Sequence, residues 1–300
     1  MGLNLKGKVA VVTGSGKEGI GTAIARALAK EGVKVVVNDI AQTPEGGYLV
    51  DKVADSIKKA GGTAVANHDS VTTMRGGENI IDTAIKNFGK IDILVNCAGN
   101  FLIERSWDFT EAQWDSLIAV HIKGHFACIK AALPYMIKQR GGRIINFSSV
   151  AAAFTHFSIG YSTAKAGVMG LTLSLAGDVQ EFGITVNAIL PSAVTALFPQ
   201  EDRSLGLGDN MPVSPWLGPE YIAPLITYLA SDEAQRITGQ LVFSSGGDLC
   251  LYQRPLQMPG PHQFIRKNGK WTAEEIKEVF ENLIPQQPYV DLDKGLPPQK

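Results

Sequence analysis

Short apolar runs alternate with amphipathic stretches along most of the chain. The run at 8–13 (KVAVVT) is apolar without alternation, which indicates a strand buried on both faces. The amphipathic stretches have helical periodicity, and several end at a glycine such as Gly32 or Gly89, a residue that favours the helix C′ position. We predict strands at 8–13, 34–39, 63–69, 91–99, 142–149, 184–191 and 239–245, and helices at 19–31, 49–60, 77–88, 111–139, 161–183 and 219–231.

This alternation of strand and helix predicts the fold class. Strands that are joined through helices pair in parallel, and the helices cover both faces of the sheet. We therefore expect an α/β protein with a Rossmann-type, doubly wound sheet of seven parallel strands, in a single domain over residues 1–249. The helix at 111–139 is either continuous or a broken pair, because it contains Gly124 and has Pro134 near a kink.

Two segments break the alternation. Residues 196–218 are rich in glycine, proline and polar residues, and a loop this long in a compact domain is usually functional, so we predict a substrate loop there. Residues 250–300 form a proline-rich C-terminal arm with one short helix predicted at 271–283. The arm either docks on its own domain, or crosses to another subunit or covers the active site. The sequence leaves these alternatives open.

Composition and charge narrow the classes of partner. The chain has 300 residues, is 45% hydrophobic and carries a formal net charge of −1, so it can bury a core and has no basic excess for nucleic acid. We see no secretory signal and no stretch that is long and apolar enough for a bilayer, so we expect a cytoplasmic protein with no membrane partner. The cysteines Cys97, Cys128 and Cys250 lack the spacing of metal ligands, so we expect reduced thiols and no metal site.

A glycine-rich turn at 13–21 (TGSGKEGIG) lies between the first predicted strand and helix. Glycine there lets the backbone approach a pyrophosphate, whose charge favours the helix N-terminus. The turn is not a P-loop, because Glu18 stands where serine or threonine is needed. Asp39 ends the second strand, where its carboxylate can accept the ribose hydroxyls and repel a 2′-phosphate. The pattern favours NAD over NADP, and Glu18 and Asp39 argue against a 2′-phosphate on Lys17.

Tyr161 and Lys165 are four residues apart on a predicted helix, so they share one face of it. A free tyrosine has a pKa of about 10 and forms little phenolate at neutral pH, whereas a nearby ammonium lowers that pKa. Such a tyrosine can take a hydroxyl proton as hydride leaves the carbon, and return it in the reverse reaction. Such a pair on its own is more often structural, so it indicates interconversion of an alcohol and a ketone only together with the other features of the chain.

These features together resemble the short-chain dehydrogenase/reductase family over about residues 6–248. The resemblance rests on the glycine-rich turn, Asn96-Cys97-Ala98-Gly99, Ser149, YSTAK from Tyr161, and VNAILP followed by Thr195. It implies that Tyr161 is the acid and base, that Lys165 lowers its pKa and holds the nicotinamide ribose, and that Ser149 polarises the substrate oxygen. It also implies a homotetramer or homodimer formed through the helices at 111–139 and 161–183.

The resemblance further implies an NAD site. Asp69 would cap the adenine with Ser70 beside it, and Asn96 would stabilise the sheet near the adenosine ribose. Val194 and Thr195 would meet the nicotinamide amide and the phosphates. Besides Tyr161 and Lys165, the implied cofactor residues are Gly14, Ser15, Gly19, Ile20, Asp39, Asp69, Ser70, Asn96, Ala98, Gly99, Val194 and Thr195.

The sequence departs from the family pattern around the catalytic group. The turn has one extra residue between Gly14 and Gly19, and Cys97 replaces an asparagine. The serine register is one residue short, so either Ser149 or Ser148 is catalytic, since adjacent strand residues point to opposite faces. We prefer Ser149, because the residues that follow it resemble those after the family's catalytic serine.

His121 stands where the family usually has an asparagine that supports a water relay to the lysine. It is either a member of that relay or a packed helix residue. Its setting VHIKGHF, together with VANHDSV at 65–71 and the insertion at 40–48, resembles the hydroxyacyl-CoA dehydrogenase part of peroxisomal multifunctional enzymes and their bacterial relatives. The resemblance implies a 3-hydroxyacyl-CoA or another bulky secondary alcohol.

We therefore expect an NAD-dependent oxidoreductase that acts on a small-molecule substrate, with a CoA thioester among the candidates. One alternative is an NADPH-dependent ketoreductase of the 3-oxoacyl-carrier-protein type, which Asp39 opposes. Another is a catalytically inactive subunit with the same fold, which the intact Tyr161 and Lys165 oppose.

Overall fold

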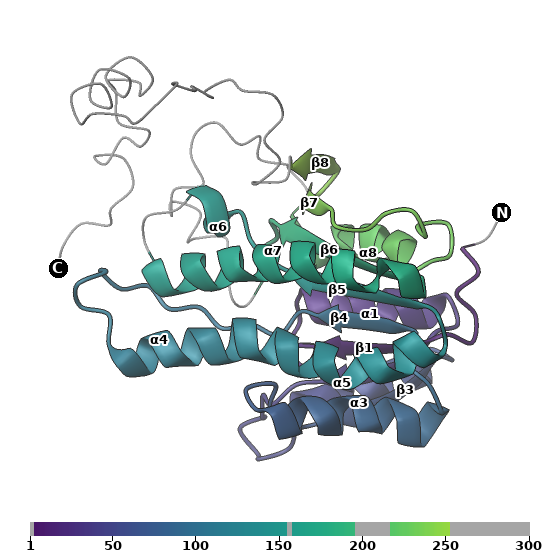
Figure 1. Ribbon diagram of the computed structural model, residues 1–300. Coiled ribbons are helices and arrows are strands. Elements are labelled where there is room, and N and C mark those ends of the chain that lie inside the picture. Colours follow the sequence, from purple (N-terminus) through teal and green to yellow (C-terminus); the bar gives the residue numbers. More distant parts are fainter. Residues whose placement is uncertain (1–2, 155–157, 196–216, 253–300) are drawn as a thin grey trace, which may run out of the picture. The chain divides into compact units, whose positions relative to one another are not determined.

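The computed structural model describes residues 3–154, 158–195 and 217–252, with the side chains of 153 and 154 left aside (Figure 1). The helix expected at 271–283 and almost all of the expected substrate loop at 196–218 lie outside these residues.

The described residues form one sheet in the strand order β3-β2-β1-β4-β5-β6-β7-β8. The seven strands predicted from the sequence are present and pair in parallel. Their bounds, with those of an eighth strand, are β1 Val9–Thr13, β2 Lys34–Asn38, β3 Thr63–Asn67, β4 Ile93–Asn96, β5 Gly142–Phe147, β6 Ile184–Pro191, β7 Leu241–Ser245 and β8 Asp248–Tyr252.

The expectation of seven strands was one too few. β8 follows β7 through the two-residue turn Gly246-Gly247 and pairs with it in antiparallel fashion, with Phe243 opposite Cys250. A Gly-Gly pair is itself a hairpin signal. The expected boundary between domain and arm at 249/250 therefore cuts a strand, and the sheet extends to Tyr252.

Helices cover both faces of the sheet, as Figure 1 shows with α3, α5 and α7 in front and α1 and α8 behind. Ala10 and Val12 of β1 pack into the apolar cluster that α1, α2 and α8 share, whereas Val9 and Val11 pack into the cluster of α3, α5 and α7. An uninterrupted apolar run is what a strand between two helical layers requires. The helices are α1 Ile20–Lys30, α2 Leu49–Lys59, α3 Met74–Phe88, α4 Glu111–Ile118, α5 Gly124–Lys138, α6 Ala151–Phe154, α7 Ile159–Val179 and α8 Ala223–Leu229.

Residues 111–138, which we expected to form either one helix or a broken pair, form one continuous helix. A π-turn at Ala119–Lys123 joins α4 to α5, and α5 runs through Pro134. At 28 residues this helix is long and apolar enough to cross a membrane by length and composition, so the expectation that no such stretch exists was wrong. The core helix of a soluble protein can be equally long and apolar, and 44% of the most apolar 18-residue part of this helix is buried inside the fold.

Candidate active site

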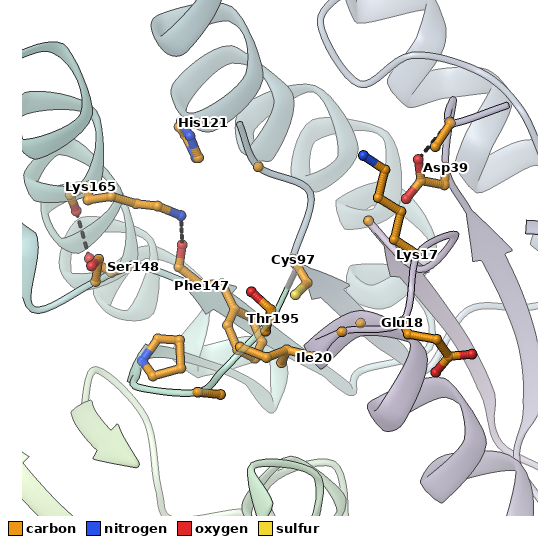
Figure 2. Close-up of a pocket in the computed structure, with 18 of the residues that line it drawn as sticks. Lys17, Glu18, Ile20, Asp39, Cys97, His121, Phe147, Ser148, Lys165 and Thr195 are labelled. Atoms are coloured by element: carbon orange, nitrogen blue, oxygen red, sulfur yellow. Dashed lines mark hydrogen bonds between the residues drawn. The ribbon is translucent and has the colours of Figure 1, made fainter. Parts of the chain in front are cut away.

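The strand order reverses between β1 and β4, and a cavity of about 530 Å³ lies at the carboxyl ends of the central strands. Such a reversal point is where open α/β sheets bind their ligands. Figure 2 shows Lys17 and Asp39 on one side of this cavity and Lys165 and Ser148 on the other. The residues predicted from the sequence that line the cavity are Gly14, Gly19, Ile20, Asp39, Gly99, His121, Ser149, Tyr161, Lys165 and Thr195.

The predicted residues Ser15, Asn96 and Ala98 support the cavity without lining it. Ser15 is fully buried, and its hydroxyl bonds to backbone groups of β1 and β2. Asn96 donates to the Asn146 side chain at 2.9 Å, which ties β4 to β5. The backbone N–H of Ala98 donates to the Thr13 hydroxyl at 3.1 Å. These contacts hold the strand ends in place around the cavity.

Asp69, Ser70 and Val194 also lie outside the lining. The Asp69 carboxylate accepts hydrogen bonds from two asparagine side chains, at 2.9 and 2.8 Å. The Ser70 hydroxyl bonds to a neighbouring threonine hydroxyl at 2.9 Å. The Val194 N–H donates to the Leu217 carbonyl at 2.7 Å. As cofactor contacts these three residues stay predictions.

The glycine-rich turn is shaped for a close approach of another group to its backbone. Gly14 has a φ of +69°, and a Cβ there would lie 2.6 Å from the Ala98 Cα, so only glycine fits. At Gly19 a Cβ would meet nothing closer than 3.9 Å, so that position is open toward the cavity. The first turn of α1 carries no acidic side chain. These residues fit a dinucleotide, whose pyrophosphate would lie at the N-terminus of α1.

Tyr161 is held tightly in the first turn of α7. The Ser158 side chain caps the helix by accepting the Tyr161 N–H at 3.4 Å. A Cβ at Gly160 would lie 2.7 Å from Leu117, so α7 packs against α4 beside the tyrosine. The Phe101 ring meets the Tyr161 ring edge-on, with centroids 4.9 Å apart. Tyr161 is 4% exposed, so packing holds its ring at the edge of the cavity that it lines.

Lys165 lies one turn further along α7, and its side chain approaches the Tyr161 ring. Its Nζ is 5.6 Å from the Tyr161 ring centroid and donates to the Phe147 carbonyl at 2.7 Å, a contact that sequence reasoning missed. Burial lowers the pKa of Lys165 to about 8. The acceptor of the Lys165 hydrogen bond is the backbone carbonyl of Phe147, so no pattern of side chains in the sequence reveals this contact.

The electrostatics of Tyr161 differ from the sequence expectation of a lowered pKa. Burial raises the pKa of Tyr161 above its ordinary value, and a hydrogen bond from the Ser149 side chain opposes that rise. Burial removes the water that would stabilise a charged phenolate, and this loss outweighs the stabilisation of the phenolate by the hydrogen bond from Ser149. In this structure Tyr161 therefore holds its proton.

The two candidate serines have different partners. Ser148 is 2% exposed, and its hydroxyl donates to the Lys165 backbone carbonyl at 2.8 Å. Ser149 forms its hydrogen bond with Tyr161 and accepts the Ala151 N–H at 3.1 Å. The geometry agrees with the preference for Ser149, because its side chain is the one beside the phenol.

His121 lies in the π-turn and is fully buried. Its Nε2 bonds to the Asn100 carbonyl at 2.8 Å, and its ring meets the Tyr161 ring edge-on at 5.3 Å. A π-turn within an α-helix is often found at functional sites. His121 therefore ties the segment after β4 to the long helical rod next to Tyr161.

A second histidine, His125, is buried one turn beyond His121. Burial lowers the pKa of His125 to about 3 and the pKa of His121 well below 6.5. His121 Nδ1 and His125 Nε2 have no hydrogen-bond partner among the described residues. Both rings are therefore neutral in the folded protein.

We expect the fold to lose stability in mild acid because of these two rings. The unfolded chain binds protons at its ordinary histidine pKa, whereas the folded chain does not. Stability is therefore complete above about pH 6.5 and falls as the pH drops toward the folded pKa values, by about 1.4 kcal/mol per histidine per pH unit. Urea unfolding between about pH 7.5 and 5.5 measures this slope. His125→Asn should reduce the slope of unfolding free energy against pH by the amount that one proton contributes. An unchanged slope would refute the assignment of a neutral, buried His125.

Comparisons with known proteins agree with this arrangement. A profile of the short chain dehydrogenase family matches residues 8–204. The peroxisomal hydratase-dehydrogenase-epimerase of Saccharomyces cerevisiae is 42% identical over 78% of this chain, which spans 25% of that enzyme. The hydroxyacyl-CoA dehydrogenase ChsB1 of Mycobacterium tuberculosis is 30% identical over 97% of this chain and 94% of its own length. A solved short chain dehydrogenase from Mycobacterium avium superposes with a TM-score of 0.81 at 36% identity, covering 98% of this chain and 97% of its own.

Proposed function

Because the chain belongs to the short-chain dehydrogenase family, and is thus an oxidoreductase acting on hydroxyl or keto groups, we propose that it interconverts a 3-hydroxyacyl-CoA and a 3-oxoacyl-CoA with NAD. The observation that carries the proposal is the placement of Tyr161, Ser149 and Lys165 around one cavity that also contains the glycine-rich turn. Proton transfer by these three side chains needs a group that donates or accepts the hydride. The glycine-rich turn fits a dinucleotide, which can supply that group.

Each catalytic side chain has one task. Bound NAD supplies the hydride acceptor in oxidation and, as NADH, the donor in reduction. In reduction the protonated Tyr161 Oη donates its proton to the substrate oxygen. In oxidation Tyr161 first releases its own proton, and the resulting phenolate then takes the hydroxyl proton of the substrate. The Ser149 hydroxyl lies beside the phenol, and its hydrogen would turn from the phenol oxygen to the substrate oxygen when substrate binds. The Lys165 ammonium offsets the negative charge that Tyr161 acquires when it gives up its proton.

Asp39 supports NAD as the cofactor. Its carboxylate lines the end of the cavity away from Lys165, as Figure 2 shows. A carboxylate there accepts hydrogen bonds from ribose hydroxyls and repels a 2′-phosphate. Lys17 lies on the same side, so Asp39 is the group on which discrimination against NADP depends.

Two features support an acyl-CoA substrate. The Mycobacterium tuberculosis relative, which matches along nearly its whole length, is a hydroxyacyl-CoA dehydrogenase. In addition, the partly buried side chains of Phe101, Leu102 and Phe109 pack around Tyr161 and Leu117. Apolar side chains in contact with the acid and base suit an acyl chain better than a polar sugar.

A substrate and cofactor matrix tests the proposal. The purified chain is assayed by NADH or NADPH absorbance with a 3-hydroxyacyl-CoA, the matching free 3-hydroxy acid and an unrelated secondary alcohol. We expect kcat/KM to be at least about tenfold higher for the thioester than for the free acid, and for NAD than for NADP. A preference for NADP would instead favour a biosynthetic ketoreductase, and equal use of the free acid would remove the CoA assignment.

We also propose a homo-oligomer formed through the long helices. Phe126 is 48% exposed and Tyr135 38% exposed on α5, and Trp114 is 37% exposed on α4. Large exposed side chains on neighbouring elements are typical of subunit contacts. Light scattering should give two or four times the chain mass of 32.1 kDa, whereas a monomer at micromolar concentration would contradict this expectation.

A further inference from the structure

The glycine-rich turn lies against the end of β2. Between Gly14 and Gly19 the turn has room to reach Asn38 and Asp39, and it makes backbone contacts there. Ser15 N–H donates to the Asn38 carbonyl at 3.0 Å. Gly16 N–H donates to the Asp39 carboxylate, at Oδ2, over 2.8 Å. The turn is thus fastened to the strand that carries the ribose-binding acid.

Gly16 is required at this contact by space and not by backbone conformation. Its φ is outside the left-handed region that favours glycine. A Cβ built on Gly16 would lie 2.6 Å from the Asp39 Cβ and 2.8 Å from its Cγ. Real Cβ atoms do not approach other atoms this closely, so any side chain at 16 must displace Asp39 or the turn.

The Asp39 carboxylate is held at both oxygens. Gly16 donates to Oδ2, and the Ala41 N–H donates to Oδ1 at 2.8 Å. An ionised carboxylate has about four acceptor positions, so about two remain for other donors. Asp39 lines the cavity, and two vicinal ribose hydroxyls would need both of those positions. The orientation of the carboxylate is therefore set before any ligand arrives.

We propose that Gly16 determines cofactor choice, by positioning the Asp39 carboxylate to receive both hydroxyls of an adenosine ribose. This inference rests on the proposed use of NAD and adds a residue that no pattern in the glycine-rich turn singles out. It follows that the charge of Asp39 alone is not sufficient for NAD preference. The carboxylate must also keep the position that the Gly16 N–H gives it.

Gly16→Ala tests the proposal. We expect KM for NAD to rise about tenfold or more, because the ribose loses hydrogen bonds to a charged group, while kcat stays within about twofold. The NAD/NADP ratio of kcat/KM should fall, since Lys17 remains on the same side of the cavity. Gly141→Ala is the matched control, because a Cβ at Gly141 meets no atom within 4 Å. Thermal unfolding of both variants reports whether they fold.

A double-mutant cycle with Asp39→Ala separates a direct from an indirect effect. If Gly16 acts through Asp39, Gly16→Ala should change KM for NAD by less than about twofold in the Asp39→Ala background. An unchanged KM in the single variant, or the full effect in both backgrounds, overturns the proposal. The wild-type cofactor preference is measured first, so failure of the NAD proposal is seen separately.

If Gly16→Ala does not fold, Asp39→Glu tests whether the position of the carboxylate matters as well as its charge. This variant retains the charge and the glycine but moves the carboxylate by one methylene. We expect the same loss of NAD affinity, measured by NADH fluorescence titration. Affinity within about twofold of the wild type would show that charge is sufficient, and would refute a positioning role for Gly16.

Discussion

Tyr161→Phe should lower kcat by about 10²- to 10⁴-fold while NADH binding stays within about twofold. The substitution removes only the hydroxyl that takes and returns the substrate proton. The ring keeps its edge-on contacts with Phe101 at 4.9 Å and His121 at 5.3 Å, so the fold around α7 should persist. Steady-state turnover and NADH fluorescence titration together measure the two quantities.

Measuring NADH binding beside kcat separates loss of the acid and base from collapse of the site. A collapse of the site would weaken both turnover and NADH binding, whereas loss of the acid and base weakens turnover alone. If the variant kept more than about a tenth of the wild-type kcat with the best substrate of the wild-type protein, another group would have to move the proton. His121, whose ring adjoins the phenol, would then be the next residue to replace.

Ser149→Ala should lower kcat by about 10²- to 10³-fold, the usual effect of removing one donor to a reacting oxygen. Ser149 forms its hydrogen bond with Tyr161, whereas the Ser148 hydroxyl donates to the Lys165 backbone carbonyl at 2.8 Å. Ser148→Ala is therefore the matched control. It should cost about 1 kcal/mol of unfolding free energy and much less activity.

The two serine variants decide between adjacent residues. Both serines line the cavity, so position alone does not separate them. If Ser148→Ala had the larger effect on kcat, with Ser149→Ala close to the wild type, the catalytic hydroxyl would be Ser148. Urea unfolding of each variant shows whether a loss of activity follows from a loss of stability.

The hydrophobic pattern was sufficient for most of the sheet. The seven parallel strands and the helices between them follow from local periodicity, because a strand between two helical layers must be apolar on both sides. β8 was not predicted, since Leu249 and Leu251 are 65% and 67% exposed on an edge strand and no buried face marks it. Its only local signal is the turn Gly246-Gly247.

The sequence by itself determined the fold class, the glycine-rich turn and the spacing of Tyr161 and Lys165, because each depends on residues that are close along the chain. Only the tertiary structure decided which serine faces the phenol and that burial raises the pKa of Tyr161. It alone brought the Gly16 N–H to within 2.8 Å of the Asp39 carboxylate. These properties depend on desolvation and on contacts between strand ends, which no local pattern encodes.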